Sequence, residues 1–249
     1  MTDLKTPSYT CTATSSKNID VFYNTGWVQT NCSEEKDPRI WCQIKIIAIP
    51  KPNKDHFTDA NYWPISLLSI CYKCLQRLLL QCANPTLEDF ITVEQAGFCK
   101  GCSTCDQVLA LTTFIENGFQ QNFKTSAIFL DLTKAYDSVW HTGLFLKLSK
   151  VLSRWLVESI TLLLSNRWFC VHMGNKSSSW RHQKNGLPWG TVLSPCLFNV
   201  YINDLPSIRS RKFIHADDIC LATQDRTFMA LEDTLSENLD KVAVFLSKC

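Results

Sequence analysis

Two apolar, strand-like stretches that carry acidic side chains constrain this sequence more than any other feature. Residues 126–132 read Ser-Ala-Ile-Phe-Leu-Asp-Leu and are apolar on both faces like a buried strand, yet they contain Asp131. A second paired element is predicted over residues 212–222 and is apolar except at its middle, which holds His215, Asp217 and Asp218. Burying a lone carboxylate in an apolar strand is costly unless it is paired, hydrogen-bonded or protonated. Two such stretches in one chain need a shared explanation.

A bound divalent cation would explain both stretches at once. If Asp131 lies on a strand adjacent to Asp217 and Asp218, their repulsion raises at least one pKa unless a cation neutralises it. Carboxylate oxygens favour Mg²⁺ or Mn²⁺ over Zn²⁺. Two ions about 4 Å apart could activate a 3′-hydroxyl and stabilise a leaving pyrophosphate in an in-line displacement. The alternative is that Asp131 caps a helix starting at Thr133 and that the other two aspartates form a hairpin turn.

The remaining pattern predicts a chain of mixed helices and strands. Residues 1–38 lack sustained periodicity and are rich in Thr, Ser, Asn and Lys, which indicates an irregular or disordered lead. Strands are predicted over 44–49 and 168–173, the latter in a hairpin with 179–183. Apolar residues at helical spacing, with Ser103 as one cap, predict helices over 65–81, 103–119, 144–164, 191–203 and 228–247.

Composition excludes some classes of protein and of site. The formal net charge of +2 produces no strong overall field. No window approaches the roughly 18 apolar residues of a membrane span, so we expect no membrane partner. The start of the chain has no apolar stretch after a basic one, so we expect an intracellular protein that is not secreted, in nucleus or cytoplasm. The 13 Cys residues then indicate free thiols, metal ligands or incidental residues rather than disulfides.

Local charge is uneven along the chain. Residues 141–190 hold one acid, Glu158, against seven basic residues, a net charge of +6. The basic residues are Lys147, Lys150, Arg154, Arg167, Lys176, Arg181 and Lys184. A basic segment between two acid-bearing strands would suit a nucleic-acid backbone beside a metal site, and a solvated basic face is the alternative.

A set of ordered motifs surrounds the carboxylates. Residues 129–139, Phe-Leu-Asp-Leu-Thr-Lys-Ala-Tyr-Asp-Ser-Val, and residues 215–218, His-Ala-Asp-Asp, resemble motifs A and C of reverse transcriptases. Between them, residues 185–205, which begin Asn-Gly-Leu-Pro-Trp-Gly, resemble motif B. Three upstream blocks resemble the fingers motifs and the block after them: Ile-Pro-Lys-Pro at 49–52, Tyr-Trp-Pro-Ile-Ser at 62–66 and Gln-Ala-Gly-Phe at 95–98. Order and spacing are similar to those of retrotransposons without long terminal repeats, closest to the jockey-like elements, from about Trp41 onwards.

The resemblance implies an α+β fold with the fingers and palm of a right-hand polymerase. It implies fingers over residues 39–125 and a palm over 126–249, with an antiparallel sheet packed on helices, a basic insertion at 141–190 and an end before the thumb. The implied activity is RNA-directed DNA synthesis by two-metal nucleotidyl transfer to a 3′-hydroxyl. The implied cofactor is Mg²⁺ or Mn²⁺, and the implied partners are an RNA template, a DNA primer and deoxynucleoside triphosphates.

The resemblance also implies site residues. Asp131, Asp217 and the Leu132 carbonyl would hold the metal, with Asp218 as a weaker catalytic partner. Tyr136 falls where the family places a ring under the incoming sugar, which would favour deoxynucleotides, and a packed helix-face Tyr is the alternative. The remaining substrate-binding candidates are Lys51 and Lys54 for the triphosphate and, in a loop where backbone approaches nucleotide and template, Gly186, Pro188, Trp189 and Gly190.

Several positions depart from the family pattern. Trp63 stands where the family has an Arg that would grip the triphosphate, so a charge-assisted contact is lost. Trp189 replaces a Gln, His215 replaces a Tyr or Phe, and Cys99 and Cys102 replace two Arg. We therefore expect a degenerate, truncated copy with impaired activity.

Two other functions stay open. The first is a non-catalytic remnant that binds nucleic acid through the basic segment at 141–190. The second is a zinc-binding module, because paired C-x-x-C spacings are a zinc signal and five thiols share such spacings: Cys71, Cys74, Cys99, Cys102 and Cys105.

Overall fold

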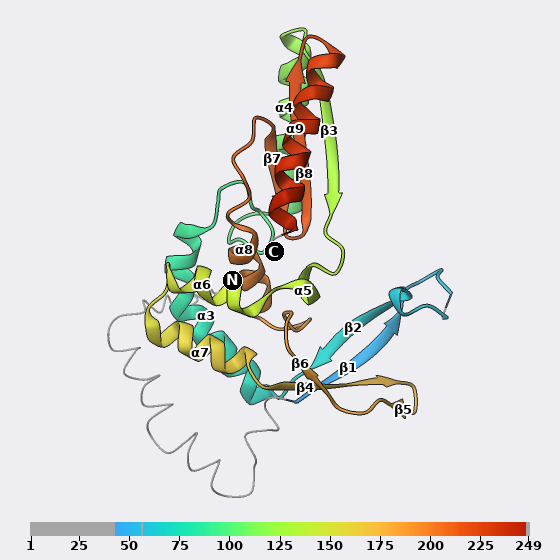
Figure 1. The fold of residues 1–249 in the computed structure, drawn as a ribbon, viewed down its shortest axis with the longest axis vertical. Coiled ribbons are helices and arrows are strands. Elements are labelled where there is room, and N and C mark those ends of the chain that lie inside the picture. Colours follow the sequence, from blue (N-terminus) through green and yellow to red (C-terminus); the bar gives the residue numbers. More distant parts are fainter. Residues whose placement is uncertain (1–42, 56, 248–249) are drawn as a thin grey trace, which may run out of the picture.

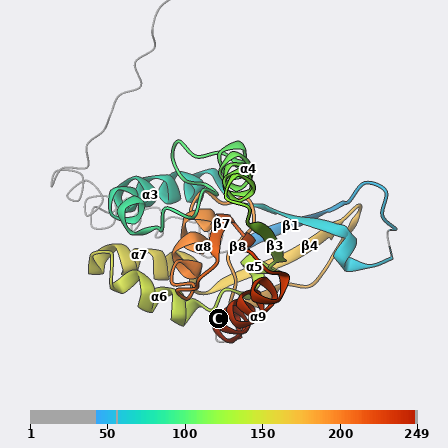
Figure 2. The same cartoon turned by 90° about the horizontal axis from the view of Figure 1, so that it is seen from above.

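The computed structural model describes residues 43–55 and 57–247. The irregular lead expected over residues 1–38 lies outside the described residues. Figure 1 shows an elongated molecule, in which a three-stranded sheet with two long helices stands above a group of further helices and a second sheet. Seen from above, the helices and the second sheet extend to opposite sides (Figure 2).

The upper part is an antiparallel sheet between two helices. Its strands are β3 (Lys124–Asp131), β7 (Arg211–His215) and β8 (Asp218–Asp225), in the order β3-β8-β7. Alternate side chains of the central strand face opposite helices. Cys220 and Ala222 pack with α4 (Thr104–Gln120), whereas Ile219 and Leu221 join the main core, which includes residues of α9 (Phe228–Leu246).

The lower sheet joins segments that are far apart in the sequence. It contains β1 (Gln43–Pro50), β2 (Tyr62–Leu67), β4 (Arg167–Met173), β5 (Lys176–Ser177) and β6 (Arg181–Gln183). β1 pairs antiparallel with β2 and parallel with β4, so Gln43 lies opposite Trp168. A 3-10 turn, Asp59–Asn61, precedes β2.

The main core is largely helical and includes Ile214, Ile219 and Leu221 of the upper sheet. It is built by α3 (Ile70–Phe90), α5 (Ala135–Ser138), α6 (His141–Ser149), α7 (Arg154–Leu164) and α8 (Ser194–Ile202). Seven of the nine residues of α8 are buried, because this helix packs against α3 and α6 on different sides. The buried helix α8 therefore lies at the centre of the main core, and its side chains bond neighbouring loops, as Asn199 does with the Gly97 carbonyl.

Two predicted helices differ from those observed. The helix expected over 65–81 begins only at Ile70, where the Ser69 side chain accepts a hydrogen bond from the Tyr72 amide, and residues before it form β2. It then continues through Pro85 to Phe90. The helix expected over 144–164 is two helices, α6 and α7, because the chain turns between them and buries Leu152 in the corner.

The other predicted elements match closely. The observed β1, β4, α4 and α9 lie within two residues of the predicted bounds. The helix predicted over 191–203 is the shorter α8, with Pro195 in its first turn as expected. Within residues 43–55 and 57–247, none of the helices has the length and apolar character that a membrane crossing requires.

Candidate active site

The predicted paired element at 212–222 is a tight hairpin. β7 and β8 are joined by a two-residue turn, Ala216 and Asp217, and His215 pairs with Asp218. Ala216 has a φ of 58°, in the left-handed region that two-residue hairpin turns use. The alternative interpretation of the two aspartates as a hairpin turn is therefore correct for the backbone of Asp217, whereas Asp218 is the first residue of β8.

The sheet brings this turn beside the end of β3. β3 pairs with β8 so that Asp131 lies directly opposite Asp218. Side chains of opposed residues in an antiparallel pair lie on the same face, with Cβ atoms about 4.5–5.5 Å apart. Asp131 does not cap a helix, because α5 begins only at Ala135 and Lys134 occupies its N-cap. The capping alternative is wrong.

The carboxylates are less buried than the apolar sequence around them predicted. Asp131 and Asp218 are exposed and Asp217 is partly buried. The reason is that β3 is an edge strand and both exposed aspartates lie at strand ends. Burial raises the pKa of Asp217, and the charges of Asp218 and Asp131 raise it further. The three groups are thus close enough to repel one another.

This donor set fits a hard divalent cation. A cation beside the carboxylates would remove the repulsion that raises the Asp217 pKa. Among the described residues, no group of three or more His, Cys, Asp or Glu side chains is arranged to hold a metal by itself. Mg²⁺ commonly takes one or two carboxylates and completes its shell with substrate phosphates and water, so a partial protein shell is consistent with it. The Leu132 carbonyl, the other expected ligand, accepts a hydrogen bond from the Ala135 amide.

Tyr136 lies beside these carboxylates but is covered by other rings. Its side chain is 6% exposed and stacks on Phe198 of α8, with ring centroids 5.0 Å apart. The Trp189 ring lies 4.9 Å away. Burial, and to a lesser extent the charge of Asp217, raises the pKa of Tyr136. The alternative of a packed Tyr describes this arrangement, and contact with a sugar stays a prediction.

The loop of residues 185–190 is fastened to the loop around α5. The Leu187 amide donates to the Tyr136 carbonyl at 2.7 Å, and the Gly186 amide donates to the Val139 carbonyl at 2.8 Å. His141 Nε2 lies 2.8 Å from the Gly186 oxygen. A Cβ on Gly186 would lie 2.8 Å from the backbone carbonyl oxygen of Asp137, and the φ of Gly186 is 85°. Only glycine fits this close approach without a shift of the backbone.

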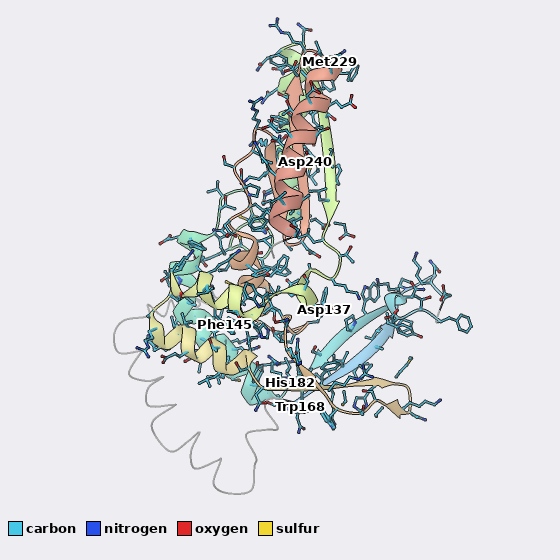
Figure 3. The ribbon with its side chains drawn as sticks, viewed as in Figure 1. Asp137, Phe145, Trp168, His182, Met229 and Asp240 are labelled. Atoms are coloured by element: carbon cyan, nitrogen blue, oxygen red, sulfur yellow. The ribbon has the colours of Figure 1, made fainter. Side chains whose placement is uncertain are left out.

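Trp189 forms a further contact between the loop of residues 185–190 and α5. Its Nε1 donates to Asp137 Oδ1 at 3.3 Å, while Pro188 beside it is buried and Gly190 is exposed. Figure 3 shows Asp137 at α5, where the upper sheet meets the lower half of the molecule. The structure therefore brings together Asp131, Leu132, Tyr136, Asp217, Asp218 and the loop from Gly186 to Gly190.

Two expected triphosphate contacts lie elsewhere. Lys51 and Lys54 occupy the loop at the end of the β1–β2 hairpin, which projects away from α5 in both views (Figures 1 and 2). Trp63 lies on β2 opposite Ile49, half-exposed. The role of the two lysines stays a prediction.

The basic segment is only partly available as a surface. Arg167 is 1% exposed and packs over the Tyr72 ring in the core, so its inclusion in a solvated face was wrong. Lys147 pairs with Asp204, and Arg154 pairs with Glu158. The basic residues that remain exposed are Lys150, Arg154, Lys176, Arg181 and Lys184, of which Arg154 is paired at the surface with Glu158.

Thiols gather loosely around the start of α4. Cys102 and Cys105 are exposed, Cys99 is partly buried, and burial together with Cys102 and Glu88 raises the pKa of Cys99. No three thiols among the described residues form a metal-binding group. The zinc-module interpretation gains no support from this arrangement.

One buried residue beside the site had no role in the sequence prediction. Gln95 lies in the Gln-Ala-Gly-Phe block and bonds to the turn at Ala216. Its position directly before the small residues Ala96 and Gly97, which allow close backbone approach, was the available signal. Its partner lies 121 positions away, which no local pattern could reveal.

Comparison with known proteins agrees with the motifs. Residues 49–249 match the family model described as reverse transcriptase (RNA-dependent DNA polymerase). The chain is 32% identical over 222 residues to the probable RNA-directed DNA polymerase from transposon BS of Drosophila melanogaster, covering 85% of this chain and 24% of that protein. It is 30% identical over 214 residues to the RNA-directed DNA polymerase from mobile element jockey of Drosophila funebris, covering 82% and 23%. The chain thus spans about a quarter of the length of these relatives.

Solved structures agree on the fold. Apo telomerase from Candida tropicalis, truncated from its C-terminal domain, superposes with a TM-score of 0.57 at 13% identity, over 91% of this chain and 51% of that chain. At this identity the likeness shows the fold alone, and it supports the predicted α+β palm and fingers. The chain therefore belongs to the reverse transcriptase (RNA-dependent DNA polymerase) family, as a domain of the type found in retrotransposons without long terminal repeats.

Proposed function

We propose that this domain catalyses RNA-directed DNA synthesis by adding deoxynucleotides to the 3′-hydroxyl of a primer, and that this copy does so with impaired activity. One observation carries the proposal. Asp131 at the end of β3 lies opposite Asp218, and the turn residue Asp217 lies beside both and beside Tyr136. Carboxylates converging at a sheet edge suit metal-assisted nucleotidyl transfer.

Asp131 and Asp217 are the proposed metal-holding carboxylates, with the Leu132 carbonyl as a further oxygen. Two Mg²⁺ or Mn²⁺ ions, when bound, would activate the primer hydroxyl and neutralise the leaving pyrophosphate. Asp218 is more exposed than Asp217 and adds negative charge beside it. Gly186 and Gly190 keep side-chain atoms away from the position proposed for the nucleotide.

The proposed partners are an RNA template, a DNA primer and deoxynucleoside triphosphates. The relatives are named RNA-directed DNA polymerases, and a telomerase from Candida albicans, solved with a fragment of telomeric RNA, has a TM-score of 0.51 with this chain at 11% identity. The exposed residues Lys150, Arg154, Lys176, Arg181 and Lys184 are the basic side chains of residues 141–190 open to a phosphate backbone.

Two tryptophans support the proposed impairment. Trp63 cannot make the charge-assisted phosphate contact of an Arg. Trp189 covers the ring of Tyr136 and bonds to Asp137, so a sugar would have to displace an indole before reaching Tyr136. Nucleotide binding should weaken for both reasons.

Primer extension tests the proposal. The protein is incubated with a primed RNA template, deoxynucleotides and Mg²⁺ beside Asp217→Asn, which preserves size and removes the charge. Weak extension that Asp217→Asn abolishes supports a metal-dependent polymerase. Extension that survives the substitution refutes the assigned carboxylate. Tight binding of the primed template without any extension, in both proteins, would instead favour the non-catalytic nucleic-acid-binding remnant.

A further inference from the structure

The Gln95 side chain holds the turn that carries Asp217. It is 4% exposed, and its Oε1 accepts hydrogen bonds from the Ala216 amide at 2.9 Å and the Gly97 amide at 2.7 Å. Its Nε2 donates to the Ala216 carbonyl at 3.2 Å. Both polar groups of Ala216 are thus bonded by one amide, much as a neighbouring strand would bond them.

The segment around Gln95 follows the outer edge of β7. The Ile214 amide donates to the Glu94 carbonyl at 3.0 Å, and the Ala96 amide donates to the Ile214 carbonyl at 2.9 Å. Lys212 pairs with Glu94 at 2.8 Å. These contacts fix where Gln95 stands along the hairpin, so its amide meets the turn rather than the strand.

Gly97 allows this close approach and links it to the core. A Cβ at position 97 would lie 2.1 Å from the Ala216 nitrogen and 2.8 Å from its Cα. The Gly97 carbonyl accepts from Asn199 Nδ2 of α8 at 2.7 Å. A continuous set of hydrogen bonds therefore runs from the buried helix α8 through Gly97 and Gln95 to Ala216.

Ala216 needs such support because its backbone is strained. A φ of 58° is unfavourable for a residue with a Cβ, and no side-chain hydrogen bond of its own can offset the strain. Asp217 is the next residue, so any relaxation at Ala216 moves its carboxylate relative to Asp131.

We propose that Gln95 is a positioning residue for the polymerase reaction: it holds the Ala216 peptide so that the Asp217 carboxylate stays beside Asp131. The inference rests on the proposed function of these two aspartates as metal ligands. The Gln95 side chain bonds the backbone of Ala216 and Gly97, so it acts on the carboxylates through the turn.

The test compares two substitutions that each replace a buried amide by an apolar side chain of similar size. Gln95→Met removes the bonds to the turn. Asn238→Leu is the matched control, because Asn238 is 0% exposed and bonds Ser210 and Arg209 before β7 rather than the turn. Both should lower the free energy of unfolding in urea, since each leaves buried polar partners unpaired.

Two readouts separate positioning from mere stability. Mn²⁺ affinity, measured by electron paramagnetic resonance on the protein without nucleotide, should fall about 10–100-fold in Gln95→Met, as it does when groups that orient metal ligands are removed. Hydrogen exchange of peptides covering 212–220 should accelerate in Gln95→Met. Neither readout should change in Asn238→Leu.

Equal Mn²⁺ affinity and equal exchange in the two variants would overturn the proposal. If the wild-type protein shows no Mn²⁺ binding that Asp217→Asn removes, the proposed metal site fails, whereas exchange at the turn still decides whether Gln95 holds it. If Gln95→Met does not fold, Gln95→Glu replaces it, because Glu keeps an acceptor for the two amides and sets a carboxylate oxygen against the Ala216 carbonyl. Its added charge would itself change Mn²⁺ affinity, so exchange is the readout for this variant: exchange of peptides covering 212–220 should accelerate, and unchanged exchange would refute the inference.

Discussion

A close backbone approach in the loop of residues 185–190 predicts a large effect from one methyl group. In Gly186→Ala, the added Cβ would lie 2.8 Å from the backbone carbonyl oxygen of Asp137 and 3.0 Å from the Asp137 Cα. The φ of residue 186 is 85°. Gly101→Ala is the matched control, because Gly101 has a φ of 75° and nothing within 4 Å of an added Cβ. Both substitutions place an alanine at a positive φ, and only Gly186→Ala also brings its Cβ against backbone atoms of Asp137.

The expected magnitudes follow from these two terms. The left-handed conformation costs an alanine about 1–2 kcal/mol, so the free energy of unfolding should fall by this amount in both variants. Overpacking against backbone adds about 1–3 kcal/mol in Gly186→Ala alone. For a domain of this size the excess corresponds to a melting temperature lower by about 2–12 °C, since each kcal/mol shifts it by about 2–4 °C.

Urea denaturation followed by circular dichroism measures both free energies of unfolding. The clash should also push the loop of residues 185–190 away from α5. That shift would stretch the hydrogen bonds that the Gly186 amide and carbonyl make with Val139 and His141. Primer extension should therefore fall in Gly186→Ala and not in Gly101→Ala. Equal destabilisation of the two variants would refute the reasoning, since it would mean that the approach to Asp137 is not tight.

Three further predictions address the loop, a helix cap and pH. Trp189→Gln should uncover the Tyr136 ring and lower the KM for deoxynucleotides in primer extension; an unchanged KM would show that the indole does not obstruct the sugar. Ser103→Ala removes the capping box with Asp106 and should lower the free energy of unfolding by about 0.5–2 kcal/mol in urea denaturation. Burial lowers the pKa of His141 from its usual 6.5, so folding favours the neutral ring, and stability should fall as pH drops through 6.5 toward the lowered value. Unfolding measured against pH should show a shallower loss in His141→Gln, and an identical profile would contradict this assignment.

The elements that the sequence predicted well are those with local signals. Ser103 with its capping partner marks the start of α4, and the Thr227 side chain accepts a hydrogen bond from the Ala230 amide at the start of α9. Strand β1 ends at Pro50, where the turn residues begin. Each of these signals acts within a few residues, so a short window of sequence contains it.

The predictions that failed depended on contacts between distant segments. Arg167 has the charge of a surface residue, yet it is buried over Tyr72, 95 positions earlier. Asp131 reads as buried from its apolar neighbours, yet it is exposed because β3 became the edge of its sheet. Edge position and burial are decided by which strands pair and not by the strand's own residues.

By itself the sequence determined the family, the order of the motifs and the identity of the acidic residues, because these are properties of residue type and spacing. Only the tertiary structure decided that Asp131 meets Asp218, that Trp189 covers Tyr136, and that Gln95 bonds the turn at Ala216. The physical reason is that long-range pairing follows from the packing of the whole core around α8, in which each contact depends on the others.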